Sequence, residues 1–422
     1  MYPNIANHTN YIFHVDVNSA FLSWSAIKRL RDDPGSIDLR TIPSAVGGDV
    51  KTRHGIITAK SIPAKKYGIV TGEPVVKALQ KCPKLVLVES DFTTYRECSR
   101  AFIEILNTYS PLVEQVSIDE AYVDITGTKL LYKNIETEEM PFPLCVAQKL
   151  KDEIRDTLGF TVNVGISSNK LLSKMASDFS KPDKIHTLFP EEIQEKMWPL
   201  PIDDLYGCGK ATADRLRSIG IRTIGEAAKS DMNFLINILG ENTGNYIHAA
   251  ANGIGNSVVS VNYEDAKSYS NETTLSFDLT SGNYDTDIVP ILKGLSGHVS
   301  RRLKRDQVYG KTITVSIKTA DFKRHSCQMQ LEDSTNDEGK IYEHAKRLAD
   351  KLLLGEEGLF VKGAAIRLVG VGLSKLDDGS YRQMSLFDNY VPDDKRKKLD
   401  ALEQQLQSAY GKDVIKKGVP LT

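Results

Sequence analysis

The alternation of apolar and polar residues predicts a strand near the start of the chain, followed directly by a helix. Side chains alternate over residues 11–17, and apolar residues then recur at Phe21, Trp24 and Ile27, the spacing of one helical face. The change of spacing places Asp16 near the end of the predicted strand.

The segment "EQVSIDEAYVDIT", residues 114–126, has the pattern of a β-hairpin with Asp119 and Glu120 at its tip. Helical patterns flank it at 93–110 and 143–158. The later segment "TVNVGISSNKLLSKMASDF" predicts a buried strand, a loop and a helix. Strands that carry acids and lie between helices indicate an α+β core.

Two further regions have patterns of their own. "GIITAKSIPAKKYGIVTGEPVVKAL" predicts a short strand and a basic helix, broken by glycines, in a small appended lobe. Towards the C-terminus, alternating strands in "TITVSIKTADFKRHSCQMQL", a helix in "EGKIYEHAKRLADKLL" and a last strand in "GAAIRLVGVGLSKL" predict a compact β-rich domain.

Residues 182–252 have a helical pattern punctuated by Pro and Gly. Gly207 and Gly209 form a Gly-x-Gly turn before a helix that begins near Lys210, and this resembles a helix-hairpin-helix. Backbone N–H groups of such a turn can hold a DNA phosphate without recognising sequence. An ordinary pair of helices joined by a turn remains an alternative.

Composition limits the class of protein. A chain of 422 residues, 41% hydrophobic and 26% charged, suggests about three globular domains. No apolar run is long enough to cross a bilayer, and the N-terminus lacks the pattern of a secretion signal, so we expect a cytoplasmic protein. Five scattered cysteines without a Cys-x-x-Cys pair argue against zinc. The formal net charge of -1 gives no overall attraction to nucleic acid, so only local basic clusters could supply it.

Three acidic residues are the strongest chemical signal. Asp119 and Glu120, together with Asp16, would repel one another unless cations neutralise them, and Mg²⁺ prefers such hard oxygen ligands. Two ions about 3.5–4 Å apart can stabilise both oxygens of a phosphoryl transfer. The alternative is that Asp119 and Glu120 are solvated turn residues, since acids are common in turns.

Three motifs in order resemble those of the Y-family DNA polymerases, the translesion enzymes: "HVDVNSAF", "SIDEAYVDI" and "VGISSNKLLSKMASDFSKPD". The resemblance covers residues 11–376 and implies an α+β multidomain, right-hand architecture with palm, fingers, helical thumb and β-rich little finger. The implied boundaries are 1–35 and 80–180 for the palm, 36–79 for the fingers, 181–252 for the thumb, 253–270 for a linker, 271–376 for the little finger and 377–422 for a tail.

The resemblance also implies roles for individual residues. Asp16 and Asp119 would be carboxylate ligands of two Mg²⁺ ions, with Glu120 completing the primer-side site and the backbone carbonyl of Val17 also coordinating. Phe21 falls where the family has an aromatic steric gate against the ribose 2′-hydroxyl. The alternative for Phe21 is an ordinary helix residue that faces the core.

The nucleotide's triphosphate would contact lysines. Lys170, in "GISSNK", matches the family's triphosphate-binding lysine. In the fingers stretch "SIPAKKYGI", Ile62 and Lys65 replace the commoner tyrosine and arginine. Lys65 can still supply a point charge, but it lacks the bidentate fork of arginine.

Two more segments suggest macromolecular partners. The basic cluster "RRLKR" would contact DNA through Arg301, Arg302 and Arg305, although a solvated helix face is the usual fate of such runs. The tail segment "RQMSLFDN" looks like a sliding-clamp binding motif; its predicted contact residues are Gln383, Ser385, Leu386 and Phe387. A stray hydrophobic pair is the alternative.

The resemblance implies a monomeric DNA-directed DNA polymerase that binds primer–template DNA, deoxynucleoside triphosphates and the sliding clamp. It would extend a primer 3′-hydroxyl with low fidelity and bypass damaged bases in DNA repair. The alternative function is a non-catalytic, clamp-tethered scaffold that binds DNA at lesions; the presence of all three acids argues against it. A nucleotide cyclase is a poorer alternative, because it leaves the helix-hairpin-helix and the tail unexplained.

Overall fold

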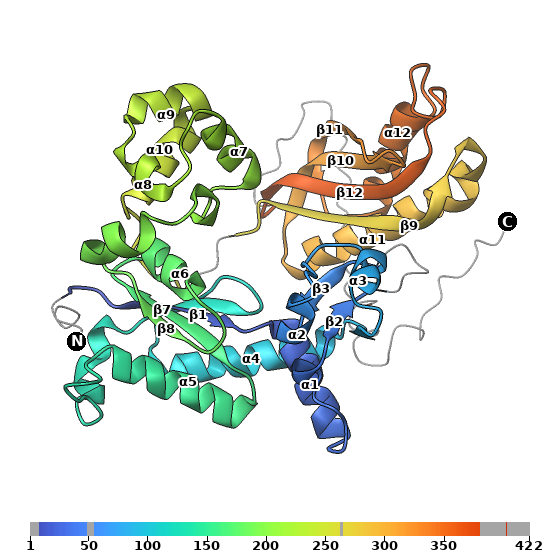
Figure 1. Cartoon of the computed structure of the whole chain (residues 1–422). Helices are drawn as coiled ribbons and strands as arrows, with labels where there is room; N and C mark the ends of the chain where they lie inside the picture. Colours follow the sequence, from blue (N-terminus) through green and yellow to red (C-terminus); the bar gives the residue numbers. More distant parts are fainter. Residues whose placement is uncertain (1–7, 49–54, 262–264, 380–401, 403–422) are drawn as a thin grey trace. The chain divides into compact units, whose positions relative to one another are not determined.

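The computed structural model describes residues 8–48, 55–261, 265–379 and 402. The chain forms two compact units, Met1–Asp265 and Ala266–Thr422, which are described one at a time (Figure 1). The predicted clamp-binding residues Gln383, Ser385, Leu386 and Phe387 lie outside the described residues. Among the described residues, no helix has the length and hydrophobicity needed to cross a membrane.

A five-stranded sheet is the centre of the N-terminal unit. Its order is β5-β6-β1-β7-β8, so β1 lies in the middle and pairs antiparallel with both β6 and β7. The strands are β1 (Ile12–Val17), β5 (Val113–Gln115), β6 (Glu120–Asp124), β7 (Val162–Ser167) and β8 (Ile185–Thr187). Every side chain of β7 is buried, as expected for a strand covered on both faces.

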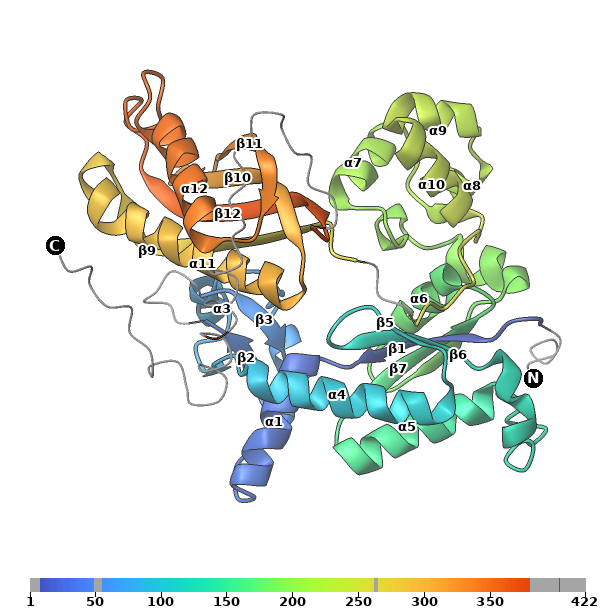
Figure 2. The same cartoon turned by 180° about the vertical axis from the view of Figure 1, so that it is seen from behind.

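Helices cover both faces of this sheet. Helices α4 (Phe92–Tyr109) and α5 (Leu144–Leu158) lie on one face and α6 (Lys170–Asp178) on the other (Figures 1 and 2). Asp91 caps α4 by accepting hydrogen bonds from backbone N–H groups, and Asn169 caps α6 in the same way. Helix α1 (Ala20–Asp32) follows β1 and buries Trp24 completely.

A smaller sheet forms next to α1. It has the order β3-β2-β4, with strands β2 (Ser44–Gly47), β3 (Ile57–Lys60) and β4 (Val86–Val88). Helices α2 (Ile62–Lys65) and α3 (Val75–Lys81) accompany it. A separate apolar cluster, which includes Ala45, Ile57 and Val75, holds this lobe together.

The last part of the N-terminal unit is helical, as the sequence predicts. Its helices are α7 (Lys210–Ser218), α8 (Ile224–Lys229), α9 (Met232–Leu239) and α10 (Glu241–Ala251). Their apolar side chains form one cluster with Leu172 and Met175 of α6. Helix α6 therefore links the central sheet to the helical region.

The C-terminal unit contains a four-stranded antiparallel sheet of order β11-β10-β12-β9. Its strands are β9 (Ser268–Leu279), β10 (Tyr309–Thr319), β11 (Arg324–Thr335) and β12 (Ile366–Asp377), and helices α11 (Val289–Arg305) and α12 (Glu338–Leu353) share a core with it. Strand β9 begins within the segment that was predicted as a linker. The mixture of helices and sheets in both units confirms the predicted α+β multidomain class.

Candidate active site

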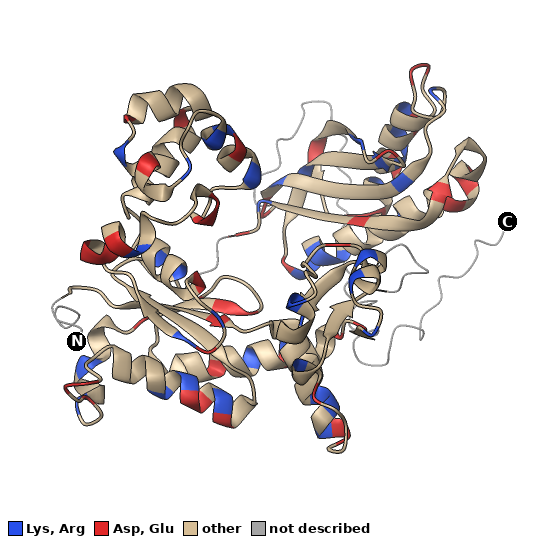
Figure 3. Cartoon of the chain, in the orientation of Figure 1, with Lys and Arg blue, Asp and Glu red and all other residues tan. Residues whose placement is uncertain are grey.

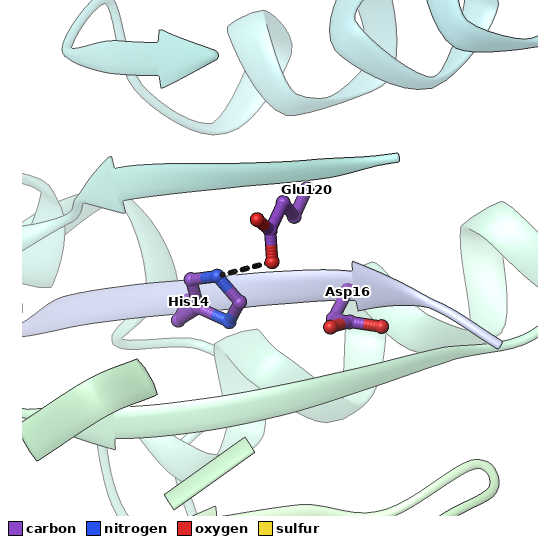
Figure 4. Close-up of side chains that lie close together, drawn as sticks. All are labelled: His14, Asp16 and Glu120. Atoms are coloured by element: carbon purple, nitrogen blue, oxygen red, sulfur yellow. Dashed lines mark ion pairs between the residues drawn. The ribbon is translucent and has the colours of Figure 1, made fainter. Parts of the chain in front are cut away.

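The central sheet brings the predicted acidic residues together. In the antiparallel pair β1·β6, Asp16 lies opposite Glu120, and the N–H of Val17 donates to the carbonyl oxygen of Asp119 at 3.0 Å. Possible ligand atoms of His14, Asp16 and Glu120 all lie within 4.8 Å of one another (Figure 4). The pairing of two strands about a hundred residues apart thus creates the acidic cluster.

His14 was not predicted as a site residue. It projects from β1 next to Asp16, is almost completely buried, and its Nε2 lies 3.3 Å from Glu120 (Figure 4). Its Nδ1 lies 2.8 Å from the hydroxyl of Ser177. Burial lowers the pKa of His14, and a neutral imidazole can donate from Nε2 to Glu120. A polar residue inside a buried strand was the available signal in the sequence.

The two adjacent carboxylates at the hairpin tip have different environments. The hydrogen bond from His14, followed by the contacts with Lys174, lowers the pKa of Glu120 to about 2. Burial raises the pKa of Asp119, and the charges of Asp16 and Glu120 raise it further, although the hydroxyl of Ser117 donates to it at 2.7 Å. Asp119 is therefore the member of the pair that gains most from an added cation.

Two lysines that were not predicted as site residues face the acids. Nζ of Lys174 lies 2.9 Å from Glu120 and 3.3 Å from Asp16, and Nζ of Lys181 lies 3.0 Å from Asp16. Burial lowers the pKa of Lys174, but the carboxylates, Asp16 foremost, outweigh burial and raise it above its ordinary value. These ammonium groups hold the carboxylates in place through charge-assisted hydrogen bonds.

Lys170, which was predicted to bind the triphosphate, forms an ion pair with a carboxylate that is not one of the three predicted acids. Its Nζ lies 2.9 Å from both carboxylate oxygens of Glu114, and only 18% of its side chain is exposed. It lines a separate pocket of about 300 Å³ together with Tyr122, Tyr206 and Tyr246. Lys170 is the first residue of α6, whereas Lys174 lies one turn later and faces the acids.

A pocket of about 540 Å³ opens beside the acidic cluster. Asp16, Asp119 and Lys181 lie on its walls, together with the predicted residues Phe21 and Lys65. This volume lies within the range of small-molecule sites. Its lining also includes Ile62, Val17, Lys60, Thr71 and Arg40.

Phe21 lies on the wall of this pocket and also packs against the core. Its ring stacks on the buried ring of Tyr95, with centroids 4.6 Å apart and an angle of 10° between the planes. Trp24 and Phe92 approach the same ring. Three aromatic neighbours restrict the ring of Phe21, and its role as a steric gate stays a prediction.

The predicted DNA contacts of the helical region lie around the start of α7. Gly207 has a φ of 82°, and an added Cβ would come within 2.4 Å of the Tyr246 hydroxyl oxygen, so glycine is required there by both backbone and packing. Gly209 precedes α7, and Lys210 is its exposed first residue. This geometry leaves the helix N-terminus accessible.

In the C-terminal unit, the predicted basic residues lie in the last turns of α11. Arg305 pairs with Asp306 at 2.8 Å, and Arg302 donates to the carbonyl oxygen of Ser270. Arg301 is exposed and contacts His298. Basic and acidic residues are interspersed along both units (Figure 3), so contacts with a polyanion depend on such local groups.

The donor set fits a hard divalent cation. Carboxylate oxygens of Asp16, Asp119 and Glu120 are the ligands that Mg²⁺ prefers. Burial, followed by the charges of Asp16 and Glu120, raises the pKa of Asp119, so these surroundings disfavour its ionised form. A bound cation would remove that penalty.

Comparisons with known proteins agree with this geometry. The chain matches the impB/mucB/samB family over residues 15–178, the C-terminal domain of that family over 266–386 and the family's HHH motif over 190–221. It is 43% identical to DNA polymerase IV of Clostridium acetobutylicum, over 97% of this chain and 98% of the relative. It is 33% identical to DNA polymerase IV 1 of Bacillus subtilis, over 97% of this chain and 93% of that relative.

A solved structure shows the same fold. A chimeric Y-family DNA polymerase is 25% identical, with a TM-score of 0.72, over 86% of this chain and 98% of that chain. Family matches in both units and relatives aligned over nearly their full length show that the chain belongs to the impB/mucB/samB family, the Y-family DNA polymerases.

Proposed function

We propose that the protein is a template-directed DNA polymerase of the translesion type, which extends a primer opposite intact and damaged bases. The observation that carries the proposal is that Asp16 lies close to Glu120 in one cluster and shares a pocket wall with Asp119. The charges of Asp16 and Glu120 both act on Asp119, and Phe21 and Lys181 line the same pocket. Acids, an aromatic wall and a cation in one pocket fit a nucleoside triphosphate. Members of this family depend on metal ions, and the acidic cluster provides the donors.

Each site residue has a role in the proposed reaction, in which the primer 3′-hydroxyl attacks the α-phosphorus and pyrophosphate leaves. Asp16, Asp119 and Glu120 would hold two Mg²⁺ ions, with the carbonyl oxygen of Val17 as a further donor. Bound Mg²⁺ favours ionisation of the hydroxyl and offsets charge on the phosphates. Lys181 would bind the triphosphate, because it lies on the pocket wall.

Supporting residues act on the acids. Glu120 is oriented by His14 and Lys174, and Asp119 is oriented by the hydroxyl of Ser117. Lys170 was predicted to bind the triphosphate, but its ammonium is held by Glu114 outside this pocket. We therefore assign the triphosphate contact to Lys181 in its place.

Primer extension tests the function directly. Wild-type protein with Mg²⁺, a primed template and deoxynucleoside triphosphates is expected to add the nucleotides that the template specifies, and to continue past a damaged template base. A protein that binds the primed template without extending it would instead be the non-catalytic scaffold. No observation on the described residues favours that scaffold, since all three acids are present and grouped.

Phe21→Ala is expected to increase incorporation of ribonucleotides. The rigid ring on the pocket wall excludes an added 2′-hydroxyl by steric overlap. Loss of about 1.4 kcal/mol of this discrimination corresponds to a roughly tenfold rise in the ratio of ribonucleotide to deoxynucleotide kcat/KM. Steady-state kinetics with both nucleotides measure the ratio.

Two controls isolate the effect at Phe21. Phe21→Tyr keeps the ring, and Phe92→Ala removes a neighbouring ring that does not line the pocket. Both are expected to keep the wild-type ratio. If Phe21→Ala has the same ratio of ribonucleotide to deoxynucleotide kcat/KM as wild type, Phe21 is a structural residue and not a steric gate.

The tail is proposed to bind a sliding clamp through Gln383, Ser385, Leu386 and Phe387. A double change, Leu386→Ala with Phe387→Ala, is expected to abolish stimulation of extension by the clamp, an avidity effect on the order of 10²-fold. Extension without the clamp should not change. Leu402→Ala, at an exposed leucine elsewhere in the tail, is the matched control; clamp stimulation that survives the double change would refute the assignment.

Contacts with DNA are proposed for both units. Gly207, Gly209 and Lys210 would hold a backbone phosphate at the start of α7. In the C-terminal unit, Arg301, Arg302 and Arg305 would contact the DNA backbone, although each of them also binds a group of its own unit. We assign the palm, fingers and thumb within the boundaries predicted from the sequence, begin the little finger at β9, and expect a cytoplasmic monomer.

A further inference from the structure

One wall of the pocket comes from the small lobe. Strand β3 contributes Thr58 and Lys60, helix α2 contributes Ile62 and Lys65, and Thr71 lies next to them. Strand β3 is at the edge of its sheet, and the segment that carries Thr71 follows its outer side, where Gly72 and Glu73 exchange backbone hydrogen bonds with Ile57. This wall faces the same pocket as the acids.

The cations around the pocket differ in their partners. Arg40 donates to Asp38 and to the carbonyl oxygen of Gly159, and Lys181 pairs with Asp16 and Asp178. Within the part of the chain that the structure describes, neither Lys60 nor Lys65 forms an ion pair. The lobe's wall therefore carries two positive charges without a carboxylate partner.

Lys60 is held in position by a neutral group. Its Nζ donates to the hydroxyl of Thr71 at 3.1 Å, and the loop that carries Thr71 is fixed where the N–H of Gly72 donates to the carbonyl oxygen of Ile57. Burial lowers the pKa of Lys60, and the charge of Lys65 lowers it further. Glu73 opposes this effect, but its carboxylate is bound by Lys81 at 2.6 Å.

Two neighbouring ammonium groups on one pocket wall repel each other, and an anion bound between them would offset this repulsion. At the two positions where the sequence resemblance predicts a tyrosine and an arginine, the lobe has Ile62 and Lys65. Lys65 by itself offers a phosphate one point charge, whereas an arginine would offer two parallel hydrogen bonds. Lys60 supplies a second point charge on the same wall.

We infer that Lys60 is a substrate-binding residue that contacts a phosphate group, next to Lys65 and held by Thr71. The phosphate belongs either to the incoming nucleotide or to the template strand. This inference rests on the proposed polymerase function. It assigns to the lobe a phosphate contact made by two lysines instead of one arginine.

Lys60→Gln tests the assignment, since glutamine keeps a polar chain of similar length and removes the charge. Two measurements distinguish the sources of the phosphate: KM and kcat for the incoming nucleotide at saturating DNA, and the Kd for primed template without nucleotide. One of the two, KM or Kd, is expected to rise about tenfold, the usual effect of losing a charge-assisted hydrogen bond. Lys60→Arg should retain most of the affinity.

Lys66→Gln is the matched control, because Lys66 is an exposed neighbour that does not line the pocket. A higher KM with unchanged Kd supports contact with the nucleotide, and the reverse supports contact with the template. If Lys60→Gln and Lys66→Gln both match wild type in KM and Kd, the inference is overturned. Wild-type extension tests the polymerase function separately, so that result would leave the function standing.

Discussion

Asp119→Asn and Glu120→Gln are each expected to lower the rate of primer extension by on the order of 10³-fold, or about 4 kcal/mol of transition-state stabilisation. Each substitution keeps the size of the side chain and removes the negative charge that a cation needs. Single-turnover extension with saturating DNA and nucleotide measures the effect. Glu104→Gln, at an exposed carboxylate on α4, is expected to extend at the wild-type rate.

The same two variants are expected to change stability in opposite directions when divalent cations are chelated. Burial raises the pKa of Asp119, so its ionised form opposes folding at neutral pH, and Asp119→Asn should melt at or above the wild-type temperature. The pKa of Glu120 is lowered to about 2, so its contribution is present above its unfolded pKa and is lost as pH falls towards 2. Glu120→Gln should therefore melt lower at neutral pH.

This difference separates catalysis from folding. Lost extension in Asp119→Asn together with an intact melting transition would place the defect in the chemistry. If both variants extend primers as wild type does, the acidic cluster is not the catalytic site and the proposed function fails.

Gly165→Ala is expected to destabilise the N-terminal unit by about 3 kcal/mol, the upper part of the usual range for overpacking. Gly165 lies in β7, where α6 approaches the strand, and an added Cβ would come within 2.0 Å of the carbonyl oxygen of Ser173 and 2.4 Å of the backbone nitrogen of Ser177. Backbone atoms cannot rotate away as a side chain can. Thermal unfolding should show a loss on the order of 5–10 °C.

Gly127→Ala is the matched control, since an added Cβ there would have no atom within 4 Å and the φ of Gly127 is not positive. Displacement of α6 by Gly165→Ala would also move Lys174 and Ser177 away from Glu120 and His14, so extension should fall as well. An unchanged melting temperature in Gly165→Ala would show that α6 can move back from β7 at little cost.

Strong periodic patterns predicted most of the fold. The helices expected at 93–110 and 143–158 are α4 and α5, whose observed bounds differ by a residue or less at each end. Strand β9 (Ser268–Leu279) was not predicted, because "SYSNETTLSFDL" is largely polar and the strand is stabilised by pairing with β12. The composition of a segment does not reveal that it will pair with a strand about a hundred residues away.

Within the site, the sequence also did not predict which lysines contact the acidic cluster. Lys170, Lys174 and Lys181 lie within one short segment, and only the first was predicted to bind the substrate. The packing of α6 on the sheet decides that Lys170 meets Glu114 while Lys174 and Lys181 meet the acids. His14 was overlooked because its partners, Ser177 and Glu120, are more than a hundred residues away.

By itself, the sequence determined the three acids near strand ends, the aromatic residue after β1 and the order of the three motifs, and it predicted that these residues carry the chemistry, because such signals depend on local patterns and residue type. The tertiary structure alone decided which cations face which acids. Those contacts depend on strand register and helix packing, since a shift of one residue turns a side chain to the opposite face of the sheet.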